Sequence, residues 1–220
     1  MKKFFYRITR RCIDLVFPQP RRVAALENAT AHEINERAAP APATQHPTLS
    51  ACFSYKDPLI QQAIWEIKYR GNRRIIALFA EILADHIQAE FTERTPVESF
   101  SSPVVISSVP MPRKRLKERG WNQSDLLARA TTDALNAPWA TYEPHILKRT
   151  RASRPQTELS RAERLENMRG AFEVREPTKL VNRIVILIDD VTTTGATYTA
   201  ARAALINAGA REVMGFAVAH

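Results

Sequence analysis

The pattern of apolar and polar positions divides the chain into an irregular amino-terminal part and a regular part that begins near Leu49. In the regular part it predicts strands at residues 51–55, 103–109, 183–188 and 212–219. It predicts helices at residues 58–69, 73–91, 124–135 and 197–208. Strands that alternate with helices favour an α/β fold with an open, mainly parallel sheet flanked by helices. In such sheets, ligands bind at the carboxyl ends of the strands.

The first 48 residues lack this regularity. Residues 1–17 place their apolar side chains on an approximate helical stripe. Five prolines between residues 18 and 47 indicate a linker, with at most one short helix near residues 24–37. We therefore expect a basic amino-terminal arm and Pro/Ala-rich linker at residues 1–48, and one main domain at residues 49–220.

Composition limits the class of protein. The chain is 45% hydrophobic and 25% charged, which is typical of a soluble globular protein. Its two cysteines are too few for a disulfide framework or a four-thiolate zinc site. Arginines interrupt the apolar run after Met1, so it does not resemble a signal peptide, and no window approaches the roughly 18 apolar residues of a membrane span. We expect a cytoplasmic protein with no membrane span.

The formal charge of +9 is unevenly distributed. Residues 1–22 carry seven basic side chains and one acidic side chain, so this arm is suited to contact an anionic polymer or a membrane surface. In the main domain, basic residues concentrate at residues 113–119 and 148–169.

Two acids and a hydroxyl-rich loop follow the apolar strand at residues 183–188, in the order Asp189-Asp-Val-Thr-Thr-Thr-Gly-Ala-Thr197. Carboxylates are suited to accept hydrogen bonds from a pair of sugar hydroxyls, or to hold Mg²⁺ through water. Backbone N–H groups at the start of a helix favour an anion, and Gly195 lets the backbone approach a phosphate closely. A strand end followed by a helix cap explains one acid and one threonine only. The segment therefore favours a sugar-phosphate site.

This segment resembles the signature of type I phosphoribosyltransferases that binds 5-phosphoribosyl 1-diphosphate (PRPP), an apolar strand followed by two acids and a Thr-Thr-Gly-x-Thr loop. The resemblance implies the type I phosphoribosyltransferase fold. It implies that Asp189 and Asp190 hold the ribose 2′- and 3′-hydroxyls. It also implies a group of residues around the 5′-phosphate, namely Thr192, Thr193, Thr194, Gly195, Ala196 and Thr197.

Five of the seven residues from Arg113 to Arg119 are cationic. Arginine and lysine are suited to bind a diphosphate, but a solvated basic helix face explains the pattern equally well. The segment is similar to that of the ComF or GntX-like family, which carries an Arg-x-x-x-Arg-Gly-Phe-Asn-Gln run here. This chain has Arg115 and then Arg119-Gly-Trp-Asn-Gln123, with tryptophan in place of phenylalanine.

The same resemblance extends to Ile67-Lys-Tyr-Arg-Gly71, and in all it covers roughly residues 51–219. It implies that Arg113 and Lys114 contact the diphosphate of PRPP. The weaker candidates for this contact are Lys68, Arg70, Arg115 and Arg119.

Residues 148–169 are predominantly basic and show no clear apolar period before residue 162. In type I phosphoribosyltransferases, a flexible loop in this part of the chain closes over PRPP. The resemblance therefore implies that Arg149, Arg151 and Arg154 neutralise charge on the leaving group and act in catalysis. An ordinary exposed basic loop is an equally good interpretation.

Members of this family often carry Cys-x-x-Cys pairs that bind zinc after an initial Leu-Phe-Pro. Here Val16-Phe-Pro18 is followed by Gln-Pro-Arg-Arg, and the paired cysteines are missing. We therefore predict no zinc. The resemblance implies Mg²⁺ bound mainly through PRPP, with Asp189 and Asp190 as candidate ligands. The first 48 residues are a candidate remnant of the hood that covers the acceptor in type I enzymes.

Three functions remain open. The resemblance implies an enzyme that transfers phosphoribosyl from PRPP to an unknown nitrogen acceptor and releases diphosphate. The second function is a PRPP or nucleotide sensor that binds without turnover. The third is a DNA-handling accessory protein that contacts single-stranded DNA or other competence proteins, because the family is associated with DNA uptake and with the use of external DNA. A homodimer is compatible with each of them.

Overall fold

The computed structural model describes residues 21–44, 46–94, 104–150 and 170–220. Within them, five parallel strands form one sheet in the order β1-β7-β6-β2-β3. The strands are β1 (Leu49–Phe53), β7 (Glu212–Ala219), β6 (Ile184–Val191), β2 (Val104–Ser108) and β3 (Ala140–Tyr142). The predicted α/β fold with an open parallel sheet is confirmed.

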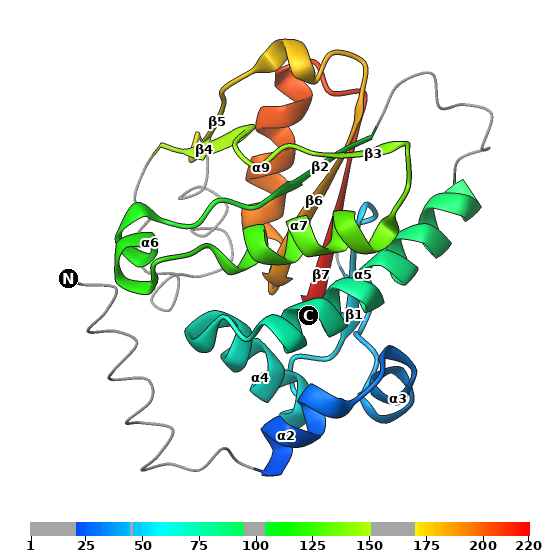
Figure 1. Ribbon diagram of the computed structural model, residues 1–220. Helices are drawn as coiled ribbons and strands as arrows, with labels where there is room; N and C mark the ends of the chain where they lie inside the picture. Colours follow the sequence, from blue (N-terminus) through cyan, green and yellow to red (C-terminus); the bar gives the residue numbers. More distant parts are fainter. Residues whose placement is uncertain (1–20, 45, 95–103, 151–169) are drawn as a thin grey trace.

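Helices cover both faces of this sheet (Figure 1). One face is covered by α5 (Arg73–Arg94) and α7 (Gln123–Leu135), which pack against each other, and α4 (Pro58–Trp65) lies beside them. The other face is covered by α9 (Ala196–Asn207) and a small antiparallel ribbon. That ribbon consists of β4 (Leu147–Arg149) and β5 (Phe172–Val174), and a short 3₁₀ turn, η4 (Pro177–Lys179), follows it.

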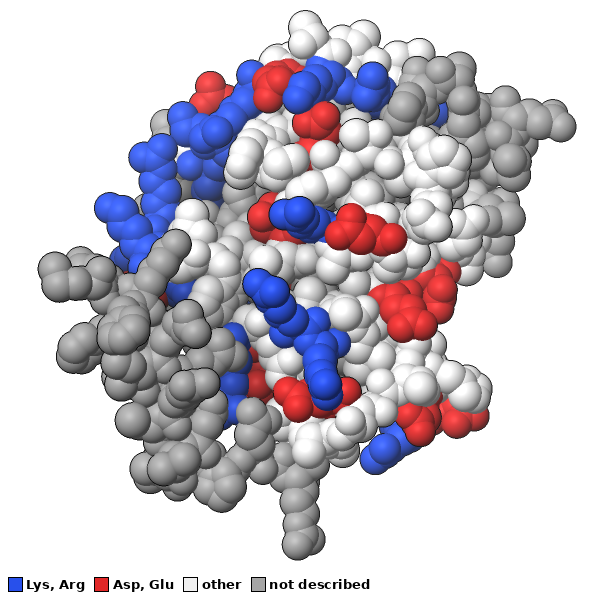
Figure 2. Space-filling model, in the orientation of Figure 1, with Lys and Arg blue, Asp and Glu red and all other residues white. Residues whose placement is uncertain are grey.

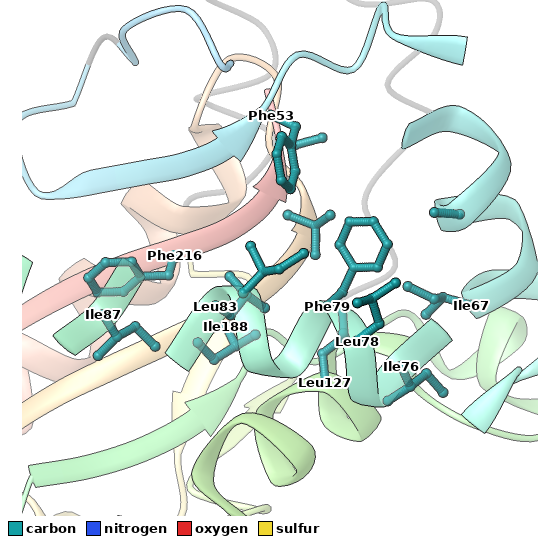
Figure 3. Close-up of a cluster of buried hydrophobic side chains, with 14 of the residues drawn as sticks. Phe53, Ile67, Ile76, Leu78, Phe79, Leu83, Ile87, Leu127, Ile188 and Phe216 are labelled. Atoms are coloured by element: carbon teal, nitrogen blue, oxygen red, sulfur yellow. The ribbon is translucent and has the colours of Figure 1, made fainter. Parts of the chain in front are cut away.

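The strand residues alternate between two hydrophobic cores, as the pleat of a sheet requires. In β6, Ile186 and Ile188 face the core under α5 and α7, whereas Val185 and Leu187 face the core under α9. Figure 3 shows Ile188 and Phe216 among leucine, isoleucine and phenylalanine side chains of α5, with Leu127 of α7 close by. Burial on both faces accounts for the unbroken apolar run that the sequence shows here.

Two helices precede the first strand, α2 (Arg21–Asn28) and α3 (Ala31–Arg37), whereas the sequence pattern predicts at most one. The break between them has a clear cause, because Thr30 and Glu33 form a reciprocal capping box at the start of α3. Leu26 and Ile34 are buried in the core that includes α5. The segment from Val23 to Ala38 therefore contributes side chains to the main core, and a domain boundary at residue 48 stays a prediction.

The basic segment after β2 forms a short helix, α6 (Arg113–Arg119). None of its side chains is buried, and it ends at Gly120, whose φ of 89° lies in the left-handed region. A short exposed helix is compatible with both interpretations of this segment, the solvated helix face and the diphosphate-binding segment. Among the described residues, no helix combines the length and apolar character that crossing a membrane requires.

Candidate ligand site

A pocket of about 280 Å³ lies where β6 ends and α9 begins. Seven consecutive residues, Thr192–Tyr198, form one wall, and Asp189 and Val191 lie beside them. The remaining lining residues come from β1, β6, β7 and the segments that follow α4 and β2: Leu49, Leu187, Phe216, Lys68, Val109 and Arg115. The six residues that the resemblance assigns to the 5′-phosphate therefore all line one pocket.

The loop before α9 is fixed at both ends. The Thr192 N–H donates to the carbonyl of Ala219 at 2.9 Å, which ties the loop to β7. Gly195 has a φ of 71°, in the left-handed region, and its carbonyl accepts from the Thr199 N–H in the first turn of α9. The loop thus ends at the amino terminus of a twelve-residue helix, where an anion is favoured.

Asp189 is one of the residues that line this pocket. Its Oδ1 accepts from Ser124 Oγ at 2.7 Å and from the Asp190 N–H at 2.9 Å. Burial, followed by the adjacent charge of Asp190, raises the pKa of Asp189 to about 8. Two fixed donors on one oxygen leave Oδ2 as the atom best placed to accept from a ligand hydroxyl.

Asp190 has different surroundings. It is only 4% exposed and is not among the described residues that line the pocket. Its Oδ1 accepts from Gln123 Nε2 at 3.2 Å, and its Oδ2 lies 2.7 Å from Lys68 Nζ. Both oxygens of this carboxylate are therefore engaged by other side chains of the protein.

Lys68 reaches Asp190 from a π-helical turn, η1 (Glu66–Arg70), which follows α4 directly. The sequence pattern predicts a single helix to residue 69, but the α-helix ends at Trp65. The turn closes at Gly71, whose φ is 56°, and Trp121 Nε1 donates to the Ile67 carbonyl at 3.4 Å. Single π-helical turns are rare in proteins overall, but those that occur are often found at functional sites.

The predicted basic residues separate into those at the pocket and those away from it. Lys68 and Arg115 line the pocket, whereas Arg113 and Lys114 lie exposed on α6 and are not among its lining residues. Arg70 lies 3.5 Å from the buried Glu66, and Arg119 donates to Gln123 Oε1 and stacks over Tyr69.

Arg149, on β4, lies close enough to the site for the charges of Arg115 and Asp189 to shift its pKa. Burial and then the charge of Arg115 lower the pKa of Arg149, while Asp189 acts in the opposite direction. Its guanidinium also lies over the ring of Phe172, at 5.5 Å. Arg151 and Arg154 fall outside the described residues. The catalytic roles of these three arginines stay predictions.

No protein-family model matches the chain. It is 32% identical over 160 residues to competence protein F of Haemophilus influenzae, a match that covers 72% of this chain and 66% of the relative. It is 30% identical over 156 residues to the DNA utilization protein YhgH of Escherichia coli, covering 71% of this chain and 65% of the relative. The matches thus span just under two thirds of the length of these curated relatives.

The chain belongs to the ComF-like family. The parallel sheet confirms the predicted α/β class, and the finer prediction, the type I phosphoribosyltransferase fold, stays a prediction. Among solved structures, the chain is similar to an HGPRT-ase from Leishmania tarentolae in complex with GMP, at 13% identity and a TM-score of 0.36 over 66% of each chain.

Two side chains at the start of α7, Gln123 and Ser124, hold the acid pair of this ComF-like chain and were not predicted to do so. The signal for Gln123 was present, since it ends the Arg119–Gln123 run. The adjacency of β2 and β6, which brings α7 against β6, could not be read from the sequence.

Among the described residues, no group of three or more histidine, cysteine, aspartate or glutamate side chains is arranged to hold a metal ion. Asp189 is the only carboxylate among the described lining residues of the pocket. The prediction that the chain binds no zinc remains untested.

Proposed function

We propose that this chain is a PRPP-binding, phosphoribosyltransferase-like protein that transfers phosphoribosyl to a nitrogen acceptor and releases diphosphate. The observation that carries the proposal is the pocket at the end of β6, where Thr192–Tyr198 form one wall and Asp189 lies beside them. A phosphate is favoured at the start of α9, and a carboxylate next to it can accept from sugar hydroxyls. A ribose 5-phosphate carries both groups.

The charges around the pocket support a second anionic group on the ligand. Lys68 and Arg115 line the pocket, and Arg149 lies close enough for its pKa to respond to both Arg115 and Asp189. Two or three cations around one site exceed what a single phosphate at a helix terminus requires. A diphosphate on C1′ of the ribose would meet this charge.

In the proposed reaction, the lone pair of the acceptor nitrogen forms the new bond to C1′ while the bond from C1′ to the diphosphate oxygen breaks. The bonding electrons leave with the diphosphate, and the nitrogen loses its proton to solvent. The chain's own residues act by position and charge: the loop before α9 fixes the phosphate, Asp189 fixes the sugar, and the cations stabilise the leaving group.

Mg²⁺ is proposed to enter with the diphosphate. The fit is partial, because Asp189 is the only described carboxylate that lines the pocket, and Mg²⁺ commonly binds through one or two carboxylates together with substrate phosphates and water. When bound, the ion would supply positive charge to the departing diphosphate.

Titration calorimetry with PRPP and Mg²⁺ tests this proposal. The wild-type chain should bind PRPP at about pH 9, where Asp189 with its pKa of about 8 is ionised. There Asp189→Asn should weaken binding by about tenfold or more, because a hydrogen bond to a charged acceptor contributes about 1.5–3 kcal/mol. Asp133→Asn is a matched control, since Asp133 is exposed on α7 and is not among the residues that line the pocket. If the wild type gives no heat, the proposal is wrong.

Turnover separates an enzyme from a sensor. If the chain is an enzyme, diphosphate should be released when PRPP and a suitable nitrogen base are both present, and Asp189→Asn should reduce that release. Diphosphate release across a panel of purine, pyrimidine and nicotinamide-type bases measures this. Tight PRPP binding with no release for any base would favour the sensor.

A second candidate function, DNA handling, is supported by the names of the relatives and by surface charge. One relative is called a DNA utilization protein and another a competence protein. Figure 2 shows lysine and arginine side chains gathered along the edge of the molecule where Figure 1 places α6 and the β4–β5 ribbon. Such a band is suited to bind the phosphates of a nucleic acid.

Single-stranded DNA binding measured against salt concentration tests the second function. Replacing Lys114 and Lys117 of α6 with glutamate should weaken binding and flatten its salt dependence, whereas deletion of residues 1–22 tests the basic arm separately. PRPP binding should survive that deletion. If neither change affects DNA affinity, DNA binding by these two segments is excluded.

A further inference from the structure

The two neighbouring acids near the end of β6, Asp189 and Asp190, make different contacts. Asp189 lines the pocket and has one oxygen held by Ser124 and by a backbone N–H. Asp190 is buried, and its two oxygens face Gln123 and Lys68. Two acids that shared one task, such as holding two hydroxyls of one sugar, would both be expected to offer an oxygen to the pocket.

Lys68 connects Asp190 to the pocket. Its Nζ lies 2.7 Å from Asp190 Oδ2, and its side chain, 23% exposed, is one of the pocket's lining residues. A buried carboxylate requires a partner charge, and a lysine held by such a carboxylate loses most of its conformational freedom. Asp190 therefore fixes the position of a cation at the pocket wall.

Asp190 is itself held in place from the other side. Gln123 donates through Nε2 to Asp190 Oδ1 at 3.2 Å, and Arg119 donates to Gln123 Oε1. An arginine on the carbonyl oxygen of the amide directs the amide N–H groups toward Asp190. The order of contacts is Arg119, Gln123, Asp190, Lys68, and the last of these reaches the pocket.

The turn that carries Lys68 is also fixed. Trp121 donates to the carbonyl of Ile67, the residue before Lys68, and the left-handed Gly71 closes the turn. Arg119, Trp121 and Gln123 lie in one short segment, so the same five residues support both the turn and the carboxylate. The ammonium group of Lys68 is therefore held in place both by Asp190 and by the backbone of its own turn.

We infer that Lys68 is the residue that contacts the diphosphate end of PRPP, and that Asp190 positions Lys68 instead of holding a ribose hydroxyl. This inference rests on the proposed PRPP site and refines it. In the proposed site, the start of α9 binds the 5′-phosphate and Asp189 binds the sugar. The remaining anionic group of PRPP is its diphosphate, and Lys68 and Arg115 are the cations among the described lining residues.

The test compares PRPP, which carries the diphosphate, with ribose 5-phosphate, which lacks it. Calorimetry with both ligands is run on the wild type, Asp189→Asn, Lys68→Met, Asp190→Asn and the double variant Lys68→Met/Asp190→Asn. We expect Lys68→Met and Asp190→Asn each to weaken PRPP binding by about tenfold, and each to change ribose 5-phosphate binding less than about twofold. Asp189→Asn should weaken the binding of both ligands.

The double variant separates positioning from direct contact. If Asp190 acts only through Lys68, the double variant should bind PRPP no more weakly than Lys68→Met alone. Each single variant then loses PRPP affinity through the same contact, the contact of Lys68 with the ligand. The double variant also removes both charges of a buried pair, so it avoids the unpaired carboxylate that Lys68→Met leaves and serves as a control for folding. Lys68→Arg, which keeps a cation on Asp190, should retain most of the PRPP affinity.

If Asp190→Asn weakens ribose 5-phosphate binding as Asp189→Asn does, Asp190 holds a sugar hydroxyl and this inference is overturned. Additive losses of PRPP affinity in the double variant overturn it too. If the wild type binds ribose 5-phosphate but not PRPP, or binds neither, the proposed function fails and this inference fails with it.

Discussion

A β-carbon built on Gly71 would lie 3.3 Å from Cε2 of Trp121. The two residues belong to segments 50 positions apart in the chain, and their contact packs the turn that carries Lys68 against the segment that leads into α7. The absence of a side chain at Gly71 therefore matters for space as well as for backbone conformation.

Gly71→Ala should lower the free energy of unfolding by more than the roughly 1–2 kcal/mol that a left-handed conformation costs an L-residue. The additional loss comes from the tight approach to the indole ring. Gly120→Ala is the matched control, because Gly120 has a φ of 89° but no atom within 4 Å of the added carbon. Urea unfolding of both variants measures the difference. Equal losses would show that the indole yields at no cost.

Gly215→Ala should destabilise the protein and also weaken ligand binding. The added carbon would lie 2.5 Å from Tyr198 Cε2 and 2.7 Å from Leu49 Cδ1, and both of these side chains line the pocket. Overpacking of this kind typically costs about 1–3 kcal/mol. Thermal unfolding and PRPP titration measure the two effects. Gly209→Ala, where the added carbon meets only Val181 at ordinary distances, should leave PRPP affinity unchanged.

Asp189→Asn should raise stability increasingly as the pH rises from about 4 to about 8. The pKa of Asp189 is raised to about 8 in the folded protein from an ordinary value of 3.8, so the folded chain keeps a proton that the unfolded chain releases. Its contribution therefore makes the wild type less stable as the pH rises through this window. Unfolding midpoints of the wild type, Asp189→Asn and the exposed-site control Asp133→Asn measure it across this range. A constant difference between wild type and Asp189→Asn would contradict the raised pKa.

Ile34→Ala should destabilise the whole domain, by about 2–5 kcal/mol, because the side chain of Ile34 is 1% exposed and packs in the core that contains α5. Glu36→Ala, on the exposed face of the same helix, is the control. A single, shifted unfolding transition would place residues 31–37 in the main domain. If the main transition does not move, the division near residue 48 is supported.

The strands were predicted well where the sequence itself carries the cause. In β7, the predicted bounds and the observed bounds agree, and in β6 continuous apolar character matched burial on both faces. The turn between β6 and α9 was also expected from the sequence, because a strand end, a glycine and a helix start are local features. The strands β3, β4 and β5 are three residues each, too short for a period to show.

The contacts of Asp190 could not be predicted, because they depend on residues far away in the chain. Lys68 reaches it only because α4 passes into a π-helical turn, and helix periodicity does not distinguish such a turn from a continuing α-helix. The helix α3 is a different case. Its capping box, Thr30 with Glu33, is a local signal that the sequence displays, but the neighbouring alanines and prolines favoured a linker.

The position of β7 has a consequence for how the protein is made. It lies between β1 and β6, so among the described strands β1 has no partner in this sheet until Glu212–Ala219 has also been synthesised. During that interval β1 has an unpaired edge, which other chains can join. Folding of the sheet therefore depends on contacts between distant residues, and we expect it to be slow compared with that of a helical domain of the same size.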